Sequence, residues 1–273
     1  MITFPNAKIN IGLWITSKRA DGYHDIKTIF YPVRGLCDIL EFVTSTTNNC
    51  YDNITVSGIP VGPDPSGNIV LKALTIMRKR VKIPYLEIHL HKVIPPGAGL
   101  GGGSSDAAFL ISALNTHFSL GLSNEELSSI ALSTGSDCPF FLSGTPAYAE
   151  GRGDIIRPVD YIKDNLHILL VWPGIQVSTA EAYSNCTPSP REEMLTSYFT
   201  RPPEEWKHFI TNDFEESVFS KHPFLAEIKE KLCSSGAVYS AMTGSGSAIY
   251  GIFRKSPVIP SGLEKMIVYS GPL

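Results

Sequence analysis

The chain has 273 residues, of which 43% are hydrophobic and 18% are charged. This length and balance fit one large globular domain or two smaller ones, and they exclude a chain that is disordered throughout. The 23 basic and 26 acidic residues give a formal net charge of −3. We therefore expect neither a nucleic-acid-binding protein nor a polybasic membrane anchor, because both need an excess of positive charge.

The cysteines and the first residues are typical of a cytoplasmic protein. The five cysteines, at positions 37, 50, 138, 186 and 233, are far apart, so neither a CxxC redox motif nor a thiolate zinc site is expected. Residues 1–6 show no basic run followed by an apolar one, so we expect no secretory signal peptide. The uncharged stretch 107–124 is interrupted by polar residues and is expected to form a buried helix and a turn, not a membrane span.

The N-terminal segment has the two-residue period of a β-strand. Apolar residues at positions 9, 11, 13 and 15 alternate with Lys8, Asn10, Gly12 and Trp14. Successive side chains of a strand point to opposite faces, so this pattern predicts a strand that ends near the Asp21-Gly22 turn. Further strands are expected at 38–43, 86–93, 166–172, 239–243 and 248–253.

Three helices are expected between positions 68 and 134. Asn68 can cap a helix that runs to about residue 77–79, and an apolar helix continues to about residue 118. Ser123 and Glu126 have the spacing of a capping box for a helix that ends near residue 134. Turn-forming residues predict irregular structure at 44–53, 58–67 and 186–203.

The segment Pro95–Ser105 carries five glycines and two serines between an expected strand and an expected helix. Glycine permits positive φ angles and has no Cβ to block a ligand, so successive N–H groups can converge on an anion. The N-terminus of the following helix adds unpaired N–H donors and the positive end of its dipole. The segment therefore predicts a phosphate-binding loop rather than a purely structural turn.

Two other phosphate-binding motifs fit this loop less well. A Walker A loop needs Lys after its last glycine, but Gly103 stands at that position. A dinucleotide-binding GxGxxG pattern is present at Gly97, Gly99 and Gly102. Its ribose-binding acid should follow a second strand about 20 residues further on, whereas the acids at 125 and 126 begin an expected helix. A Rossmann oxidoreductase stays an alternative that binding of a nicotinamide cofactor would favour.

The glycine-rich segment resembles the central ATP motif of the GHMP kinases, which include galactokinase, homoserine kinase and mevalonate kinase. Its part 99–108 is similar to the form in the GHMP kinases that act on 4-diphosphocytidyl-2-C-methyl-D-erythritol, although Asp106 stands where these often carry Asn. Three other segments agree in the same order: Ala7-Lys8-Ile9-Asn10, Arg19-Ala20-Asp21-Gly22-Tyr23-His24 and Met242-Thr243-Gly244-Ser245-Gly246-Ser247.

The resemblance implies a two-domain α+β fold with an N-terminal mixed α/β domain, 1–157, and a C-terminal α+β sandwich, 158–273. It implies transfer of the γ-phosphoryl group of ATP, with Mg²⁺, to the 2-hydroxyl of 4-diphosphocytidyl-2-C-methyl-D-erythritol, a step of the non-mevalonate route to isoprenoid precursors. The partner is then a small molecule, and the chain is expected to be a monomer or a homodimer. The alternatives are a kinase of homoserine or mevalonate type and a non-catalytic nucleotide-binding protein of the same fold.

The resemblance also implies roles for single residues. Asp137 is expected to accept the proton of the substrate hydroxyl, and Lys8 to orient Asp137 and stabilise developing charge. Without the resemblance, Asp137 would be interpreted as a turn or cap residue before Pro139, and Lys8 as a solvated strand residue.

The remaining expected roles concern the two substrates. Asn10, Tyr23, His24 and Thr179 are expected to contact the alcohol substrate, with Tyr23 stacked on the pyrimidine and His24 at the cytosine edge. Lys92 is expected either to touch the nucleotide or to be a solvated strand end. The nucleotide loop comprises Pro95, Pro96, Gly97, Ala98, Gly99, Leu100, Gly101, Gly102, Gly103, Ser104 and Ser105. The protein ligands of Mg²⁺ are not identified, with Ser105 or Asp106 as candidates.

Overall fold

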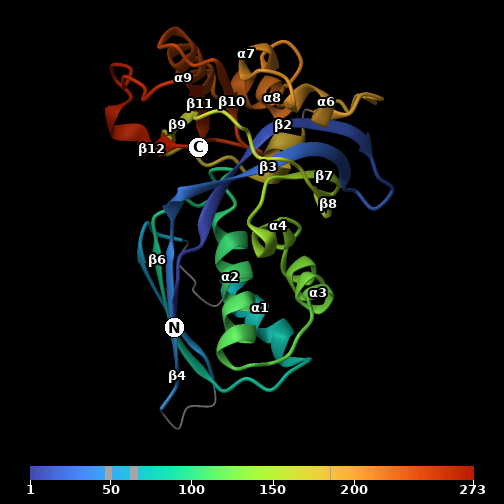
Figure 1. The fold of residues 1–273 in the computed structure, drawn as a ribbon, viewed down its shortest axis with the longest axis vertical. Coiled ribbons are helices and arrows are strands. Elements are labelled where there is room, and N and C mark those ends of the chain that lie inside the picture. The colour runs from blue at the N-terminus through green and yellow to red at the C-terminus, as the bar shows by residue number, and fades with distance from the viewer. Residues whose placement is uncertain (47–50, 62–66, 185) are drawn as a thin grey trace. The chain divides into compact units, whose positions relative to one another are not determined.

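The structure, a computed structural model, describes residues 1–46, 51–61, 67–184 and 186–273 (Figure 1). Cys50 lies outside the described residues. So do positions 62–66 of the segment 58–67, for which irregular structure is expected. The chain forms two compact units that are not continuous in sequence. Unit 1 comprises Met1–Ala7, Leu36–Pro96 and Gly101–Gly144, and unit 2 comprises Lys8–Gly35, Gly97–Leu100 and Thr145–Leu273. The two units therefore cannot be separated by dividing the chain at one residue. The boundary at residue 157 concerns the two domains of the family, and it stays a prediction.

Unit 1 contains a four-stranded sheet in the order β1-β4-β6-β5. Its strands are β1 (Ile2–Thr3), β4 (Ile39–Thr44), β6 (Leu86–Lys92) and β5 (Asn53–Gly58). β5 pairs with β6 in parallel, and the other pairs are antiparallel. β6 shows the predicted alternation, since Leu86, Ile88 and Leu90 are buried while the residues between them are half-buried.

Four helices pack on one another beside this sheet (Figure 1). They are α1 (Ile69–Arg78), α2 (Gly102–His117), α3 (Asn124–Thr134) and α4 (Cys138–Ser143). The predicted caps are confirmed: the Asn68 side chain accepts the N–H of Val70, and Ser123 and Glu126 form a reciprocal capping box. The apolar helix is confirmed as the buried α2. Among the described residues, no helix combines the length and apolar character that a membrane crossing requires.

Unit 2 contains two four-stranded sheets. The first has the order β2-β3-β7-β8, and the second, which is antiparallel, has the order β10-β11-β9-β12. The strands of the first are β2 (Asn6–Lys18), β3 (His24–Cys37), β7 (Ala147–Gly151) and β8 (Ile155–Pro158). Those of the second are β10 (Tyr239–Met242), β11 (Ile249–Phe253), β9 (His167–Val171) and β12 (Ile267–Pro272).

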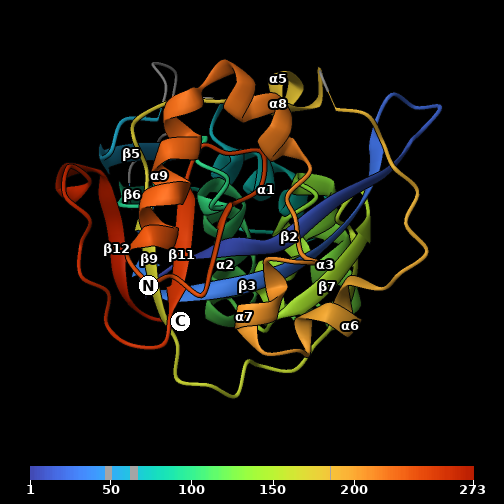
Figure 2. The same ribbon diagram turned by 90° about the horizontal axis from the view of Figure 1, so that it is seen from above.

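The described residues of unit 2 form the helices α5 (Thr179–Ser184), α6 (Leu195–Phe199), α7 (Pro203–Trp206), α8 (Phe214–Lys221) and α9 (Pro223–Ser234). α9 lies along β11 in Figure 2, and its buried Leu225, Ile228 and Leu232 share one core with Ile249 and Phe253. α6 differs from the irregular structure expected at 186–203. A short helix forms there because Leu195 and Phe199 are both buried.

β2 is confirmed as a strand, but both of its faces are buried. Lys8, Asn10 and Trp14 on one face are 3%, 2% and 2% exposed, while Ile9 and Ile11 on the other are fully buried. The alternation in the sequence therefore separates polar from apolar side chains but not solvent from core. The interpretation of Lys8 as a solvated strand residue is wrong for this reason.

Candidate active site

The first motif places a buried polar pair on β2. The Lys8 ammonium donates to the Asn10 side-chain oxygen at 2.5 Å and lies 5.1 Å from the centre of the Phe30 ring. The Asn10 amide nitrogen in turn donates to the Thr28 hydroxyl on β3 at 2.9 Å. Burial of a charged group is costly unless it is paired and hydrogen-bonded. These contacts hold the Lys8 ammonium at a defined place.

Three motifs that are far apart in the sequence meet at this pair within unit 2. The Thr243 hydroxyl, from the third motif, accepts the N–H of Asn10 at 3.0 Å and donates to the Gly99 carbonyl at 3.1 Å. The backbone N–H of Lys8 donates to the Leu100 carbonyl at 3.0 Å. Residues expected to bind substrate and nucleotide are therefore joined by direct hydrogen bonds.

The close packing of the loop explains one of its glycines. Gly99 has φ +78°, and a Cβ added there would lie 2.0 Å from the Thr243 carbonyl oxygen. At Gly97, φ is also positive, at +68°, but no atom lies within 4 Å of an added Cβ. Gly99 is thus required by the approach of the third motif as well as by backbone conformation.

The loop ends at the N-terminus of α2, which has no side-chain cap. Gly101 occupies the N-cap position with φ +72°, and as a glycine it has no side chain that could accept a hydrogen bond from the first turn. The first N–H groups of a helix are without intrahelical partners and carry the positive end of its dipole. The start of α2 can therefore bind a phosphate group, as the sequence predicts.

Within unit 1, the first turn of α2 lies beside the turn that carries Asp137. The Ser104 hydroxyl lies 3.9 Å from the Cβ position of Gly135. Ser104 also hydrogen-bonds to the buried Cys138 thiol, whose pKa is raised to about 11, mainly by burial and also by the charge of Asp137. The expected base thus lies next to the expected phosphate site.

Asp137 precedes α4 but does not act as its cap. It occupies the N-cap position with φ −81° and ψ −15°, and its side chain makes no capping hydrogen bond. A capping residue has extended backbone and accepts an N–H from the helix with its side chain. The interpretation of Asp137 as a cap residue is therefore wrong, whereas its interpretation as a turn residue agrees with the structure, where the half-buried Asp137 lies in the turn before α4. Its expected role as the base stays a prediction.

Two domain models of one protein family match parts of the chain that contain the elements described above. The GHMP kinases N terminal domain matches residues 68–145, and the GHMP kinases C terminal domain matches residues 198–264. A protein of Bacteroides thetaiotaomicron named 4-diphosphocytidyl-2-C-methyl-D-erythritol kinase is 46% identical over 95% of this chain and 94% of its own. One of Parabacteroides distasonis with the same name is 49% identical over 93% of this chain and 92% of its own. The chain belongs to the GHMP kinases.

Solved structures agree with this family assignment. A crystal structure of 4-(cytidine 5'-diphospho)-2C-methyl-D-erythritol kinase has a TM-score of 0.75 and 29% identity, covering 92% of this GHMP kinase and 89% of that chain. The structure of homoserine kinase from Cytophaga hutchinsonii has a TM-score of 0.60 at 16% identity, covering 90% of this chain and 85% of that one. The second likeness supports the fold alone.

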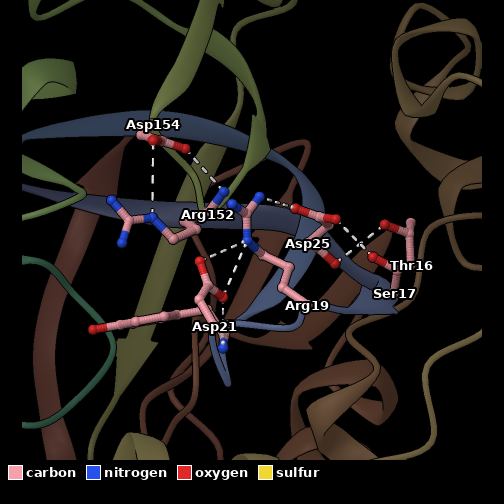
Figure 3. A network of polar contacts seen from close by, with 8 residues as sticks. Thr16, Ser17, Arg19, Asp21, Asp25, Arg152 and Asp154 are labelled. Carbon is pink, nitrogen blue, oxygen red and sulfur yellow. Dashed lines mark hydrogen bonds and ion pairs between the residues drawn. The ribbon is translucent and has the colours of Figure 1, made fainter.

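The turn between β2 and β3 carries Tyr23 and is held by charged side chains (Figure 3). Arg19 pairs with Asp21 at 3.1 Å and with Asp25 at 2.9 Å, and Asp21 accepts the Tyr23 N–H at 3.1 Å. Tyr23 is 57% exposed, and the Arg152 guanidinium lies 5.0 Å from the centre of its ring. Exposed ion pairs contribute little stability each. Their effect here is to fix the turn that presents the Tyr23 ring.

His24 lies beside an aromatic residue that sequence reasoning missed. Its imidazole stacks on the Tyr183 ring of α5, with centres 4.5 Å apart and an interplanar angle of 13°. Burial, and then the charge of Lys18, lower the pKa of His24 below its usual value. Thr179 is exposed at the start of the same helix. No sequence pattern marks Tyr183, because its partner lies 159 positions earlier in the chain.

Lys92 of this GHMP kinase differs from both alternatives drawn from the sequence. Its ammonium is buried and lies between the carboxyl groups of Asp38 and of Asp106, the latter at 2.7 Å. The side chains of Lys92, Asp38 and Asp106 are 2%, 0% and 2% exposed. The ammonium is thus neither solvated nor presented to a ligand. Asp106, a candidate Mg²⁺ ligand, is occupied by the same ion pair.

The site residues are divided between the units. Unit 1 carries Lys92, Pro95, Pro96, Gly101–Ser105 and Asp137, and unit 2 carries Lys8, Asn10, Tyr23, His24, Gly97–Leu100 and Thr179. The structure brings together Lys8, Asn10, Gly99 and Leu100 in unit 2. In unit 1 it brings Ser104 beside the turn that carries Asp137. The expected pairing of Lys8 with Asp137 joins different units and stays a prediction.

Proposed function

We propose that this GHMP kinase transfers the γ-phosphoryl group of ATP to the 2-hydroxyl of 4-diphosphocytidyl-2-C-methyl-D-erythritol. The observation that carries the proposal is the Tyr23-His24 segment beside Tyr183, in a chain whose relatives at 46% and 49% identity are named for this kinase. The exposed Tyr23 ring can stack on a base, and His24 can hydrogen-bond to its edge. Two aromatic rings and an imidazole supply the flat and polar surfaces that a pyrimidine needs.

The protonation of His24 supports a role at cytosine. Its lowered pKa keeps the imidazole neutral at pH 7, with one nitrogen a donor and the other an acceptor. The Watson–Crick edge of cytosine carries both an amino donor and ring and carbonyl acceptors. A neutral imidazole can match either group, and stacking on Tyr183 fixes its plane.

The nucleotide phosphates are proposed to bind at the glycine loop and the uncapped start of α2. The backbone N–H groups of Gly102, Gly103 and Ser104 lie in the first turn of this helix, and the Ser104 and Ser105 hydroxyls add further donors. An anion is stabilised there by both the N–H groups and the helix dipole.

Phosphoryl transfer requires a positioned hydroxyl and neutralisation of charge on the transferred group. We propose that Asp137 accepts the proton of the substrate 2-hydroxyl. The hydroxyl oxygen then bonds to the γ-phosphorus of ATP, and the bond between this phosphorus and ADP breaks. The Lys8 ammonium, fixed by Asn10, stabilises negative charge during transfer. The location of the Gly135–Cys138 turn, which carries Asp137, beside Ser104 supports this role.

We propose that the reaction uses Mg²⁺ together with ATP, where the ion would neutralise negative charge on the phosphates. The described residues contain no cluster of three or more His, Cys, Asp or Glu side chains that could hold a metal ion. A Mg²⁺ bound mainly by substrate phosphates and water fits this sparse set. Ser105 would be the protein ligand, since its buried hydroxyl has no hydrogen-bond partner among the described residues.

A cytoplasmic location and a monomeric or homodimeric state are also proposed. Support for the location comes from the cysteines, since those described (Cys37, Cys138, Cys186 and Cys233) are all free thiols, as in a reducing compartment.

The proposal is tested by measuring the ADP that the purified chain forms from Mg-ATP in the presence of one acceptor at a time. The acceptors are 4-diphosphocytidyl-2-C-methyl-D-erythritol, homoserine, mevalonate and galactose. We expect release that depends on the cytidyl acceptor alone. Release with another alcohol would keep the kinase and reject the cytidine assignment. ATP binding without release for any acceptor would reject the proposal in favour of a non-catalytic nucleotide-binding protein.

A further inference from the structure

The proposed chemistry does not use the most deeply buried charges of unit 1. Lys92, Asp38 and Asp106 form one cluster of an ammonium and two carboxyl groups, each side chain at most 2% exposed. Taking charges out of water costs more than the pairing returns in many proteins, and apolar residues of similar size can replace such clusters. The Asp106 Oδ1 atom also has no hydrogen-bond partner among the described residues. The cluster therefore needs an explanation other than stability.

The cluster holds the chain where the glycine loop begins. Lys92 is the last residue of β6. Asp38 Oδ1 accepts the next two backbone N–H groups, those of Val93 at 2.6 Å and Ile94 at 2.8 Å. Asp38 is itself fixed, because its N–H donates to the Pro5 carbonyl at 2.9 Å. The path of the chain out of β6 is thus set by one carboxylate.

The same cluster holds the chain where the loop ends. Asp106 lies in the second turn of α2 and accepts from the Lys92 ammonium at 2.7 Å. Gly102, the first residue of α2, lies against this ammonium, since a Cβ added there would be 3.2 Å from Lys92 Nζ and 2.9 Å from Ile94. The two ends of the loop are therefore bound to one buried point.

A glycine-rich loop needs such an anchor more than other loops do. Glycine loses more conformational freedom on ordering than any other residue. Ordering the loop only when nucleotide binds would subtract that cost from the affinity, whereas a loop already held at both ends avoids most of it. An anchor at the loop's ends thus acts on nucleotide affinity from a distance.

We propose that Lys92 is a positioning residue which, with Asp38 and Asp106, clamps both ends of the glycine loop and so sets the affinity for ATP without touching it. This inference rests on the proposed function, in that ATP is taken to bind at the loop. The two carboxylates act through the ammonium, and the amide of Asn at position 106 would offer it the same acceptor oxygen.

The test compares Asp106→Ala with Asp106→Asn. We expect Asp106→Ala to raise the KM for ATP about tenfold or more, with kcat and the KM for the cytidyl alcohol changed less than about threefold, because preorganisation of the loop acts on binding. Asp106→Asn should restore the KM for ATP to within about twofold of the unmodified chain, since its amide oxygen accepts from Lys92.

Asp52→Ala is the matched control. Asp52 also lies in unit 1, pairs with a cation (Arg78, at 2.8 Å) and accepts the Leu86 N–H at the other end of β6. Its loss should lower the unfolding temperature and leave the KM for ATP unchanged. Equal KM values for Asp106→Ala and Asp52→Ala, both folded by circular dichroism, would overturn the proposal and leave the cluster a purely structural feature.

Direct ADP binding, measured by calorimetry, provides a second readout on other variants of the cluster, in case Asp106→Ala does not fold. Asp38→Asn keeps an acceptor for the backbone N–H groups of Val93 and Ile94. It should therefore weaken ADP binding several-fold less than Lys92→Met, which removes the ammonium. Equal ADP affinities of these two variants would contradict the proposal. Failure of the unmodified chain to turn over the cytidyl alcohol would reject the proposed function alone. A working unmodified chain with an unaltered KM for ATP in Asp106→Ala would reject this inference alone.

Discussion

Two buried lysines define the candidate site at the level of single residues, and they differ in their contacts. The Lys8 ammonium donates to Asn10 and lies over the Phe30 ring, whereas the Lys92 ammonium is held between Asp38 and Asp106. Lys92 is fixed in a buried cluster at the start of the glycine loop, which suits it to support. The role of Lys8 at the transferred phosphoryl group stays a proposal.

Replacing Asp137 tests the proposed base. Asp137→Asn should lower kcat by about 100-fold or more, because a positioned proton acceptor contributes about that factor to catalysis. The Kd for ATP should change less than about twofold, since the phosphates are bound by backbone N–H groups. Steady-state kinetics and calorimetry measure both values. Near-normal turnover would reject Asp137 as the base.

The pH dependence of the unfolding free energy, compared between the unmodified chain and Asp106→Asn, tests the buried cluster. Burial, and the charge of Asp38, raise the pKa of Asp106 from 3.8 to about 8, against the opposing effect of Lys92. Between these two values the folded chain keeps a proton that the unfolded chain releases, so stability falls as pH rises from about 4 to 8. Among the described residues, the charged groups that act on this carboxyl are Lys92 and Asp38.

Asn has no such proton, so Asp106→Asn should gain stability over the unmodified chain as pH rises from 5 to 8. The gain should exceed about 1 kcal/mol, because one pKa unit corresponds to about 1.4 kcal/mol. Urea unfolding at four pH values across this window measures it. Unfolding free energies that run parallel for the two chains would show that Asp106 is ionised throughout.

At the level of elements, local patterns predicted what depends on neighbours in the sequence. The caps of α1 and α3, the alternation of β6 and the glycine loop before α2 all rest on residues within a few positions of one another. α6 was missed because its helix depends on burial of Leu195 and Phe199 in a segment otherwise rich in Pro, Ser and Thr. The buried polar face of β2 was missed because β3 and the third motif cover it.

The glycine loop offers an element-level test with its own control. Gly99→Ala should lower the unfolding free energy by more than about 2 kcal/mol and raise the KM for ATP, because both its φ of +78° and the carbonyl of Thr243 oppose a Cβ. Gly97→Ala has the same kind of φ but open space, so its cost should stay near about 1 kcal/mol. Urea unfolding measures both. Equal costs would show that Thr243 does not constrain the loop.

At the level of the whole molecule, sequence resemblance predicted the family, and geometry added what the motifs do to one another. The motifs at Lys8, Gly99 and Thr243 are hydrogen-bonded to each other, and Ser104 lies beside the Asp137 turn. Tyr183 and Asp38 could not be predicted, because each acts on a partner at least 54 positions away and neither lies in a motif. Long-range partners are fixed by the fold and not by local pattern.

Phosphorus NMR of the product formed from Mg-ATP and 4-diphosphocytidyl-2-C-methyl-D-erythritol, with Asp137→Asn as the control, tests both the proposed reaction and the proposed base. We expect the unmodified chain, and not the variant, to form a product with a new phosphomonoester signal from a phosphate on the 2-hydroxyl oxygen and with unchanged diphosphate signals. A phosphate on another hydroxyl, or no new signal while ATP still binds, would contradict the proposed function.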